Sequence, residues 1–258
     1  MRIRLLGVPI DTLTNQEVEH KIADFLVKKV GRAVFTPNPE MLVRARKNQS
    51  FCDTLQKGDL NIPDGVGLLW AASLFGLKIP ERVTGTDLMD VVCRLAAERG
   101  RTVYFLGGED GVASRAARRM QDRHPTLKVV GALGGGRVSI NADGEPLLSP
   151  EVEKSILITA PDVLLVAFGH EIQERWIASH LQKFFSVRVA MGIGGAFDFW
   201  AGDVSRAPRW VQKIWLEWCW RLILQPRRIG RILTAVILFP ALVLGVRLGI
   251  IKAESNKL

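Results

Sequence analysis

The sequence has few cysteines and no recognisable metal-binding motif. Its three cysteines, Cys52, Cys93 and Cys219, are far apart and irregularly spaced, which argues against both a disulfide framework and a zinc site. It contains no HExxH motif, no Asp-x-Asp pair and no Cys/His cluster, so we predict no catalytic metal. This cysteine usage is typical of a reducing compartment.

The N-terminus lacks the pattern of a signal peptide. The apolar run within residues 1–13 is short, and Arg2, Arg4 and Asp11 interrupt it. We therefore expect the globular part of the chain to stay in the cytoplasm.

Positive charge and tryptophan are concentrated towards the C-terminus. The net charge is +9, and residues 201–258 hold ten Lys or Arg against three acidic residues, which places seven of the nine charges there. Five of the seven tryptophans lie in or beside this region, and indole rings among arginines suit a lipid headgroup layer. An apolar stretch, residues 232–251, follows directly, whereas a nucleic-acid surface is usually polar around its basic residues. We expect a membrane surface as the anionic partner, and no nucleic acid.

The apolar stretch 232–251 is long enough to cross a bilayer, for which about 20 apolar residues suffice. Pro240 and Arg247 interrupt it and favour a monotopic or re-entrant position. Basic residues within 227–231 flank its start, in agreement with positive charge on the cytoplasmic side. A single span, a surface helix and a buried core helix all stay open on this evidence.

Short apolar runs rich in β-branched residues alternate with segments of helical periodicity. This rhythm predicts an α/β domain with a Rossmann-like, largely parallel sheet and helices on both faces. The expected strands are residues 33–35, 102–106, 127–130, 163–167 and 187–190. The expected helices are residues 15–30, 67–75, 87–99, 112–123, 151–160 and 172–184. A change of composition near Arg206 separates an α/β domain, residues 1–204, from an Arg/Trp-rich appendage, residues 205–258.

Two glycine turns follow expected strands, one at Gly107 and Gly108 and one around Gly194. Such turns let backbone N–H groups approach a phosphate or a ribose. Neither is a complete dinucleotide fingerprint, and a purely structural tight turn is the alternative for each. The pair favours a nucleotide-binding crevice that includes Asp198, which could also be an ordinary turn residue.

Asp64 lies at the expected carboxyl end of a strand, where ligand crevices open in parallel sheets. An aspartate there can act as a general base that accepts a proton from an attacking hydroxyl. The alternative, which spacing alone favours, is a cap for the helix that begins near Val66. Thr36 and Asn38 follow another strand, and they suit either ligand binding or a helix cap with proline at the first helical position.

Together these segments resemble the WecG/TagA/CpsF family of bacterial glycosyltransferases, also called glycosyltransferase family 26, over nearly the whole chain. The matching segments are residues 36–41, 64–67, 81–89, 105–108, 173–174, 194–198 and 201–208, followed by Glu217, Trp218, Arg221, Pro226, Arg228 and Arg231. The blocks 82–89 and 194–208 are the most specific.

The resemblance implies an inverting, metal-independent enzyme without a cofactor. It would move an N-acetylmannosamine-type sugar or a related hexose from a UDP-sugar to a polyprenyl-diphosphate-linked acceptor, in envelope polysaccharide or teichoic acid synthesis. Asp64 would deprotonate the acceptor hydroxyl. The residues implied for the sugar and diphosphate pocket are Thr36, Asn38, Arg82, Gln173, Arg221, Arg228 and Arg231. The implied location is the cytoplasmic face of the bacterial cell membrane, and a homo-oligomer stays open because family members can self-associate.

Three places depart from the family pattern. Pro63 replaces a usual small residue before Asp64, and residues 135–137 replace a Gly-Tyr-Phe-like run, which leaves an aromatic contact there open. The third place precedes Gln173. Where the family commonly has a proline and a basic residue before Gln-Glu, this chain has Glu171 and Ile172, preceded by His170. A diphosphate contact at this place is therefore lost or moved to His170. Two rival functions stay open: another sugar-nucleotide enzyme, such as an epimerase or dehydrogenase, and a non-catalytic partner in a polysaccharide assembly complex.

Overall fold

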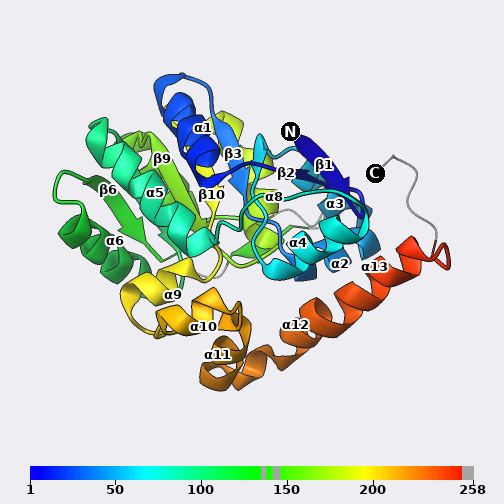
Figure 1. Ribbon diagram of the computed structural model, residues 1–258. Helices are drawn as coiled ribbons and strands as arrows, with labels where there is room; N and C mark the ends of the chain where they lie inside the picture. Colours follow the sequence, from blue (N-terminus) through cyan, green and yellow to red (C-terminus); the bar gives the residue numbers. More distant parts are fainter. Residues whose placement is uncertain (135–137, 142–145, 252–258) are drawn as a thin grey trace.

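The computed structural model describes residues 1–134, 138–141 and 146–251. Its centre is a six-stranded parallel sheet with the strand order β4-β3-β10-β9-β5-β6 (Figure 1). The strands are β3 (Arg32–Phe35), β4 (Leu60–Asn61), β5 (Thr102–Gly107), β6 (Lys128–Leu133), β9 (Val163–Ala167) and β10 (Val189–Gly192). The predicted α/β, Rossmann-like class is confirmed. All five predicted strands are present, with β10 displaced towards the C-terminus and β6 longer than expected.

Two short hairpins stand outside the main sheet. An antiparallel pair, β1 (Arg2–Leu5) and β2 (Val8–Asp11), opens the chain, and a smaller pair, β7 (Ser139–Ile140) and β8 (Pro146–Leu147), follows β6. Neither pair was predicted. The strands of these hairpins have only four or two residues, which is too short for an alternating pattern to be recognised.

Helices cover both faces of the sheet. One face carries α1 (Asn15–Val27), α5 (Gly85–Glu98), α6 (Val112–Arg123) and α9 (Ala196–Ala201). The other carries α2 (Pro39–Lys47), α3 (Gln49–Gln56), α4 (Val66–Leu74), α7 (Pro150–Thr159) and α8 (Ile172–His180). All six predicted helices are present, whereas α2, α3 and α9 were not predicted as helices.

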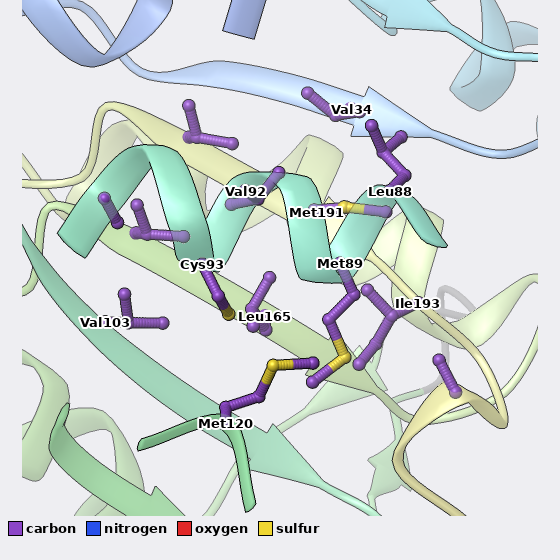
Figure 2. Packing of buried hydrophobic residues seen from close by; sticks show 14 of the residues in the cluster. Val34, Leu88, Met89, Val92, Cys93, Val103, Met120, Leu165, Met191 and Ile193 are labelled. Carbon is purple, nitrogen blue, oxygen red and sulfur yellow. The ribbon is translucent and has the colours of Figure 1, made fainter. Parts of the chain in front are cut away.

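The two hydrophobic clusters are separated by the sheet because neighbouring strand residues point to opposite faces. Phe105 belongs to one cluster and Tyr104 to the other, and both are fully buried. Figure 2 shows the first cluster, in which Met89 and Cys93 of α5 lie among residues of the sheet that include Leu165. Burying one such side chain stabilises the fold by about 1.5–3 kcal/mol. The well-packed sheet is therefore a rigid support for its loops.

The C-terminal segment runs along one side of the α/β part (Figure 1). It contains α10 (Arg209–Lys213), α11 (Glu217–Leu224), a 3-10 turn (Pro226–Arg228), α12 (Ile229–Leu233), a π-helical turn (Thr234–Leu238) and α13 (Phe239–Arg247). We call the continuous helix Pro226–Arg247 the C-terminal helix. It has 22 residues, and an 18-residue window within it has a mean hydropathy of 2.2, so it is long and apolar enough to cross a membrane.

The predicted apolar helix is therefore present, but it begins earlier than residue 232 and ends at Arg247. Pro240 does not break it, because the π-helical turn just before accommodates the missing N–H of the proline. Phe239 and Val243 are buried on the core beside α2 and α4, while Ile237 and Leu244 are exposed. Only one face of the helix is thus covered by the protein.

Candidate active site

A pocket of about 1200 Å³ opens at the carboxyl ends of the parallel strands, where ligand crevices are expected in this fold. Its walls come from the loops after β3, β4, β5, β9 and β10 and from the C-terminal segment. Ten of the twelve predicted site residues line it: Thr36, Asn38, Asp64, Arg82, Gly108, Gly194, Asp198, Arg221, Arg228 and Arg231. Segments distant in sequence thus meet in one cavity.

Asp64 lies between β4 and α4 on the wall of this pocket. Its backbone N–H donates to the carbonyl oxygen of Pro37 at 2.8 Å, and its Oδ2 accepts a long hydrogen bond of 3.4 Å from the N–H of Gly85. The residue before α4 is Gly65, which has a φ of 113° and offers no side-chain cap. Asp64 therefore does not cap α4, and its carboxylate faces the cavity.

Burial raises the pKa of Asp64 to about 6, and the charge of Glu217 acts in the same direction. Arg82, the N–H of Gly85 and Arg221 oppose this shift by favouring the carboxylate. Asp64 is consequently ionised near neutral pH, yet it is a stronger base than an exposed aspartate. A carboxylate with this basicity is suited to general base catalysis.

Thr36 and Asn38 follow β3 and lie close to Asp64 in the same pocket. The Oδ1 of Asn38 caps α2 by accepting from the N–H of Met41 at 3.0 Å, with Pro39 at the start of the helix, so the cap that the sequence left open as one alternative is present. The Nδ2 of Asn38 lies 3.4 Å from Nε2 of His170. Asn38 thus combines a structural role with a position on the pocket wall.

Gly85, at the start of α5, lies next to both Thr36 and Asp64. A Cβ atom there would be in ordinary van der Waals contact with them, 3.4 Å from Oγ1 of Thr36 and 3.9 Å from Oδ2 of Asp64. The preceding residue, Thr84, caps α5 by accepting from the N–H of Asp87 at 3.1 Å. The cap fixes the N–H of Gly85 in its position next to the Asp64 carboxylate.

Arg82 is held in position by an acidic residue of the C-terminal segment, Glu217. Its Nη2 donates to Oε2 of Glu217 at 2.9 Å, and Nε of Arg206 lies 3.4 Å from the other oxygen of the same carboxylate. Arg206 also makes two hydrogen bonds to Asp87, at 2.6 and 2.8 Å. Bidentate arginine–carboxylate pairs are geometrically specific, so this network fixes α11 relative to α5.

Arg221, Arg228 and Arg231 line the pocket from the C-terminal segment. The Cζ of Arg221 lies 4.6 Å from the centre of the Phe199 ring. Its Nη2 lies 4.0 Å from Oδ2 of Asp198. Arg231 donates to Glu40 at 2.8 Å. Burial, together with Arg221 and Arg231, lowers the pKa of Arg228 to about 10. This excess of positive charge is suited to an anionic ligand such as a diphosphate.

Two predicted site residues lie behind the pocket wall. Gln173 is 1% exposed, its Oε1 accepts from the N–H of Gly194 at 2.9 Å, and its Nε2 donates to Glu174 at 2.7 Å. Gly107 has a φ of 109°, and a Cβ there would lie 2.6 Å from the carbonyl oxygen of Ala167. Both therefore shape the glycine turns, and their roles as direct ligand contacts stay predictions.

His170 follows β9 and lines the pocket. Burial first, and then Arg231, Arg228, Arg221 and Arg44, lower its pKa to about 3, so the imidazole is neutral at physiological pH. Sequence reasoning did not single out Gly85 or give Glu217 a role. The available signal for Glu217 was its isolation, because it is one of three acidic residues among the last 58.

No group of three or more His, Cys, Asp or Glu that could hold a metal ion was found among residues 1–134, 138–141 and 146–251. The groups that could bind a charged cofactor or substrate are the arginines and the backbone of the two glycine turns. A basic carboxylate opposite clustered guanidinium groups defines a site for group transfer from a phosphorylated substrate.

Comparison with known proteins agrees with this class of site. The model of the glycosyl transferase WecG/TagA/CpsF family matches residues 3–252, and the chain belongs to this family. It is a glycosyltransferase, which selects this class over the epimerase or dehydrogenase alternatives.

Curated relatives share one name, N-acetylglucosaminyldiphosphoundecaprenol N-acetyl-beta-D-mannosaminyltransferase. The relative from Bacillus subtilis (strain 168) is 29% identical over 90% of this chain and 84% of its own length. The relative from Bacillus spizizenii is 29% identical over 87% of this chain and 84% of its own length. The relative from Staphylococcus aureus (strain MRSA252) is 28% identical over 90% of this chain and 88% of its own length.

Proposed function

We propose that the protein transfers an N-acetylmannosamine-type sugar from a UDP-sugar to an acceptor linked to a polyprenyl diphosphate. The names of its relatives specify an N-acetylmannosaminyl group and an N-acetylglucosaminyl-diphosphoundecaprenol acceptor. The single observation that carries the proposal is the placement of Asp64 and the arginines Arg221, Arg228 and Arg231 in one pocket. In this proposal the carboxylate of Asp64 acts on the acceptor hydroxyl, and the three arginines stabilise the leaving diphosphate.

In the proposed reaction the acceptor hydroxyl attacks the anomeric carbon of the donor sugar from the face opposite UDP. Asp64 removes the hydroxyl proton while the new C–O bond forms, which makes the attacking oxygen a stronger nucleophile. The bond between the anomeric carbon and the diphosphate oxygen breaks, and its electron pair leaves with UDP. The configuration of the anomeric carbon is inverted because there is one displacement.

Departure of UDP increases the negative charge on the diphosphate. Arg221 and Arg228 are placed to stabilise this charge, and their own mutual repulsion is relieved when an anion binds. The N–H groups of Gly108 and Gly194 are bonded within the protein, to the carbonyl oxygen of Ala167 and to Oε1 of Gln173, so these two glycines would serve the nucleotide by letting it approach the backbone closely. Asp198 would lie near its ribose. The guanidinium groups thereby fill the role that a metal has in many nucleotide-sugar enzymes.

We place the enzyme on the cytoplasmic face of the membrane, with the C-terminal helix lying at the surface. Phe239 and Val243 on one side of this helix pack on the core, which favours a surface position over a single span. Ile237 and Leu244 of the same helix are exposed to the surroundings. In this arrangement Ile237→Glu reduces binding to anionic vesicles in a flotation assay, while UDP binding is retained.

The direct test is a donor screen with an N-acetylglucosamine acceptor on a polyprenyl diphosphate. The wild-type protein is expected to release UDP only when donor and acceptor are both present. UDP release without acceptor, or epimerised donor, would indicate another sugar-nucleotide reaction. Calorimetric titration with UDP is the control, because absence of any nucleotide binding would favour a non-catalytic role.

A further inference from the structure

The pocket has one wall that the reaction just described does not use. This wall is apolar, and it is formed where α4 faces the C-terminal helix. Its members are Val66, Trp70, Ile232, Ala235, Val236 and Pro240. The apolar wall and Asp64 line the same cavity. A group bound at this wall therefore lies next to the substrates or forms part of one of them.

The residues that lie beneath this apolar wall are closely packed. A Cβ atom at Gly67 would lie 2.9 Å from Cγ of Pro39 and 3.6 Å from Cε1 of Phe239, so α4, α2 and α13 meet there. The rim is open, since Trp70 is 37% and Val236 is 41% exposed. The wall is therefore a groove with a solid floor and an open side.

The chemistry of the groove changes along the C-terminal helix. Arg228 and Arg231, near the start of the helix, and then Ile232, Val236 and Pro240 line the same pocket. Positions three or four residues apart lie on one side of a helix, so these side chains form one stripe that is cationic first and apolar afterwards. At about 1.5 Å per residue, the apolar part extends over roughly 12 Å.

We propose that this wall binds the first isoprenoid units of the lipid-linked acceptor, a ligand in which hydrocarbon is joined directly to a diphosphate. The diphosphate lies at the cationic end of the stripe, and the hydrocarbon lies between α4 and the C-terminal helix. The proposal rests on the proposed function for the identity of the acceptor. The order of charge and apolar surface along the helix matches that of a prenyl diphosphate.

The rest of the lipid would leave the groove over the exposed side of the same helix. Leu233 and Ile237 continue the apolar surface beyond the rim near Val236, and both are exposed. A lipid tail can thus pass from the pocket to a membrane without crossing polar surface. The groove joins the catalytic base to the membrane-facing side of the protein.

Calorimetry with farnesyl diphosphate and inorganic pyrophosphate as probes tests the groove without requiring turnover. The full-length wild-type protein is expected to bind farnesyl diphosphate at least tenfold more tightly than pyrophosphate. Val236→Ser and Trp70→Ala, as two separate variants, should reduce this ratio at least threefold with unchanged pyrophosphate affinity. Leu244→Ser is the matched control: it changes an apolar residue of the same helix that is 42% exposed and lies outside the pocket, and it should retain the ratio.

Equal affinity of the wild-type protein for farnesyl diphosphate and pyrophosphate would contradict the proposal that the groove binds isoprenoid units. So would an equal loss in the Leu244 variant, because it would indicate nonspecific contact of hydrocarbon with the helix. Failure of the proposed function has a different signature: no sugar transfer with any acceptor, while the preference for farnesyl diphosphate and its loss in the groove variants persist.

Discussion

Arg82 and Glu217 form an ion pair of 2.9 Å that joins the loop before α5 to α11 of the C-terminal segment. The two residues are 135 positions apart in sequence. Both side chains are mostly buried, and both charges act on Asp64: Arg82 lowers its pKa and Glu217 raises it. The C-terminal segment therefore takes part in setting the basicity of the proposed catalytic carboxylate.

Glu217→Gln is expected to weaken catalysis by changing both the position of Arg82 and the pKa of Asp64. Without the Glu217 charge, Arg82 favours the Asp64 carboxylate more strongly, so the acidic limb of the kcat/KM profile should move to lower pH. We expect kcat at pH 8 to fall about tenfold, which corresponds to about 1.4 kcal/mol. Glu98→Gln is the control, because its ion pair with Arg94 lies outside the pocket. An unchanged profile in the Glu217 variant would refute this coupling.

The pH dependence of the wild-type enzyme should follow the ionisation of Asp64. Its pKa is raised to about 6, so kcat/KM should be constant well above pH 6 and fall about tenfold per pH unit well below it. His170 titrates far lower, since its pKa is about 3. His170→Gln should consequently retain the acidic limb near pH 6, whereas loss of that limb would assign it to His170.

Asp64→Asn should stabilise the fold at neutral and alkaline pH. A carboxyl group whose pKa is higher in the folded than in the unfolded state favours folding at low pH and opposes it once ionised. The shift to about 6 corresponds to at most about 3 kcal/mol above pH 6. The gain in unfolding free energy should therefore be present at pH 8 and vanish below about pH 4. Chemical denaturation at both pH values measures it, and equal stability at pH 8 would show that Asp64 is well solvated.

Arg228→Gln should weaken UDP binding without destabilising the free protein. Burial and two neighbouring arginines lower the pKa of Arg228, so the free pocket contains repulsion that a neutral side chain removes. We expect UDP affinity to fall at least tenfold, because a charge-assisted hydrogen bond contributes about 1.5–3 kcal/mol. The melting temperature without UDP should be equal or higher. Arg118→Gln, which changes an exposed arginine outside the pocket, is the control.

The sequence predicts the parts of this structure that depend on local pattern. The strands of the sheet, the helix cap at Asn38 and the position of Asp64 at a strand end follow from apolar runs, proline and glycine. Spacing alone favoured a cap role for Asp64, and only the fold shows that Gly65 precedes α4 without a side-chain cap. Local pattern was insufficient because the Asp64 carboxylate is held by Gly85, which is distant in sequence.

Contacts between residues that are distant in sequence could not be predicted from the sequence. Gln173 reaches the Gly194 turn from behind the wall, and this could not be inferred because the direction of a side chain depends on tertiary packing. The same holds for the apolar face of the C-terminal helix, where composition does not distinguish Phe239, which is buried, from Ile237, which is exposed. Burial of one face is a property of the packed helix, not of its hydropathy.

The most direct test is sugar transfer by Asp64→Asn compared with the wild-type enzyme, measured at pH 8 with a UDP-sugar and a polyprenyl-diphosphate-linked acceptor. Removing the base should lower kcat at least 100-fold, while UDP affinity and vesicle binding are retained. Turnover by Asp64→Asn within a few-fold of the wild-type rate would contradict the assignment of Asp64 as the catalytic base.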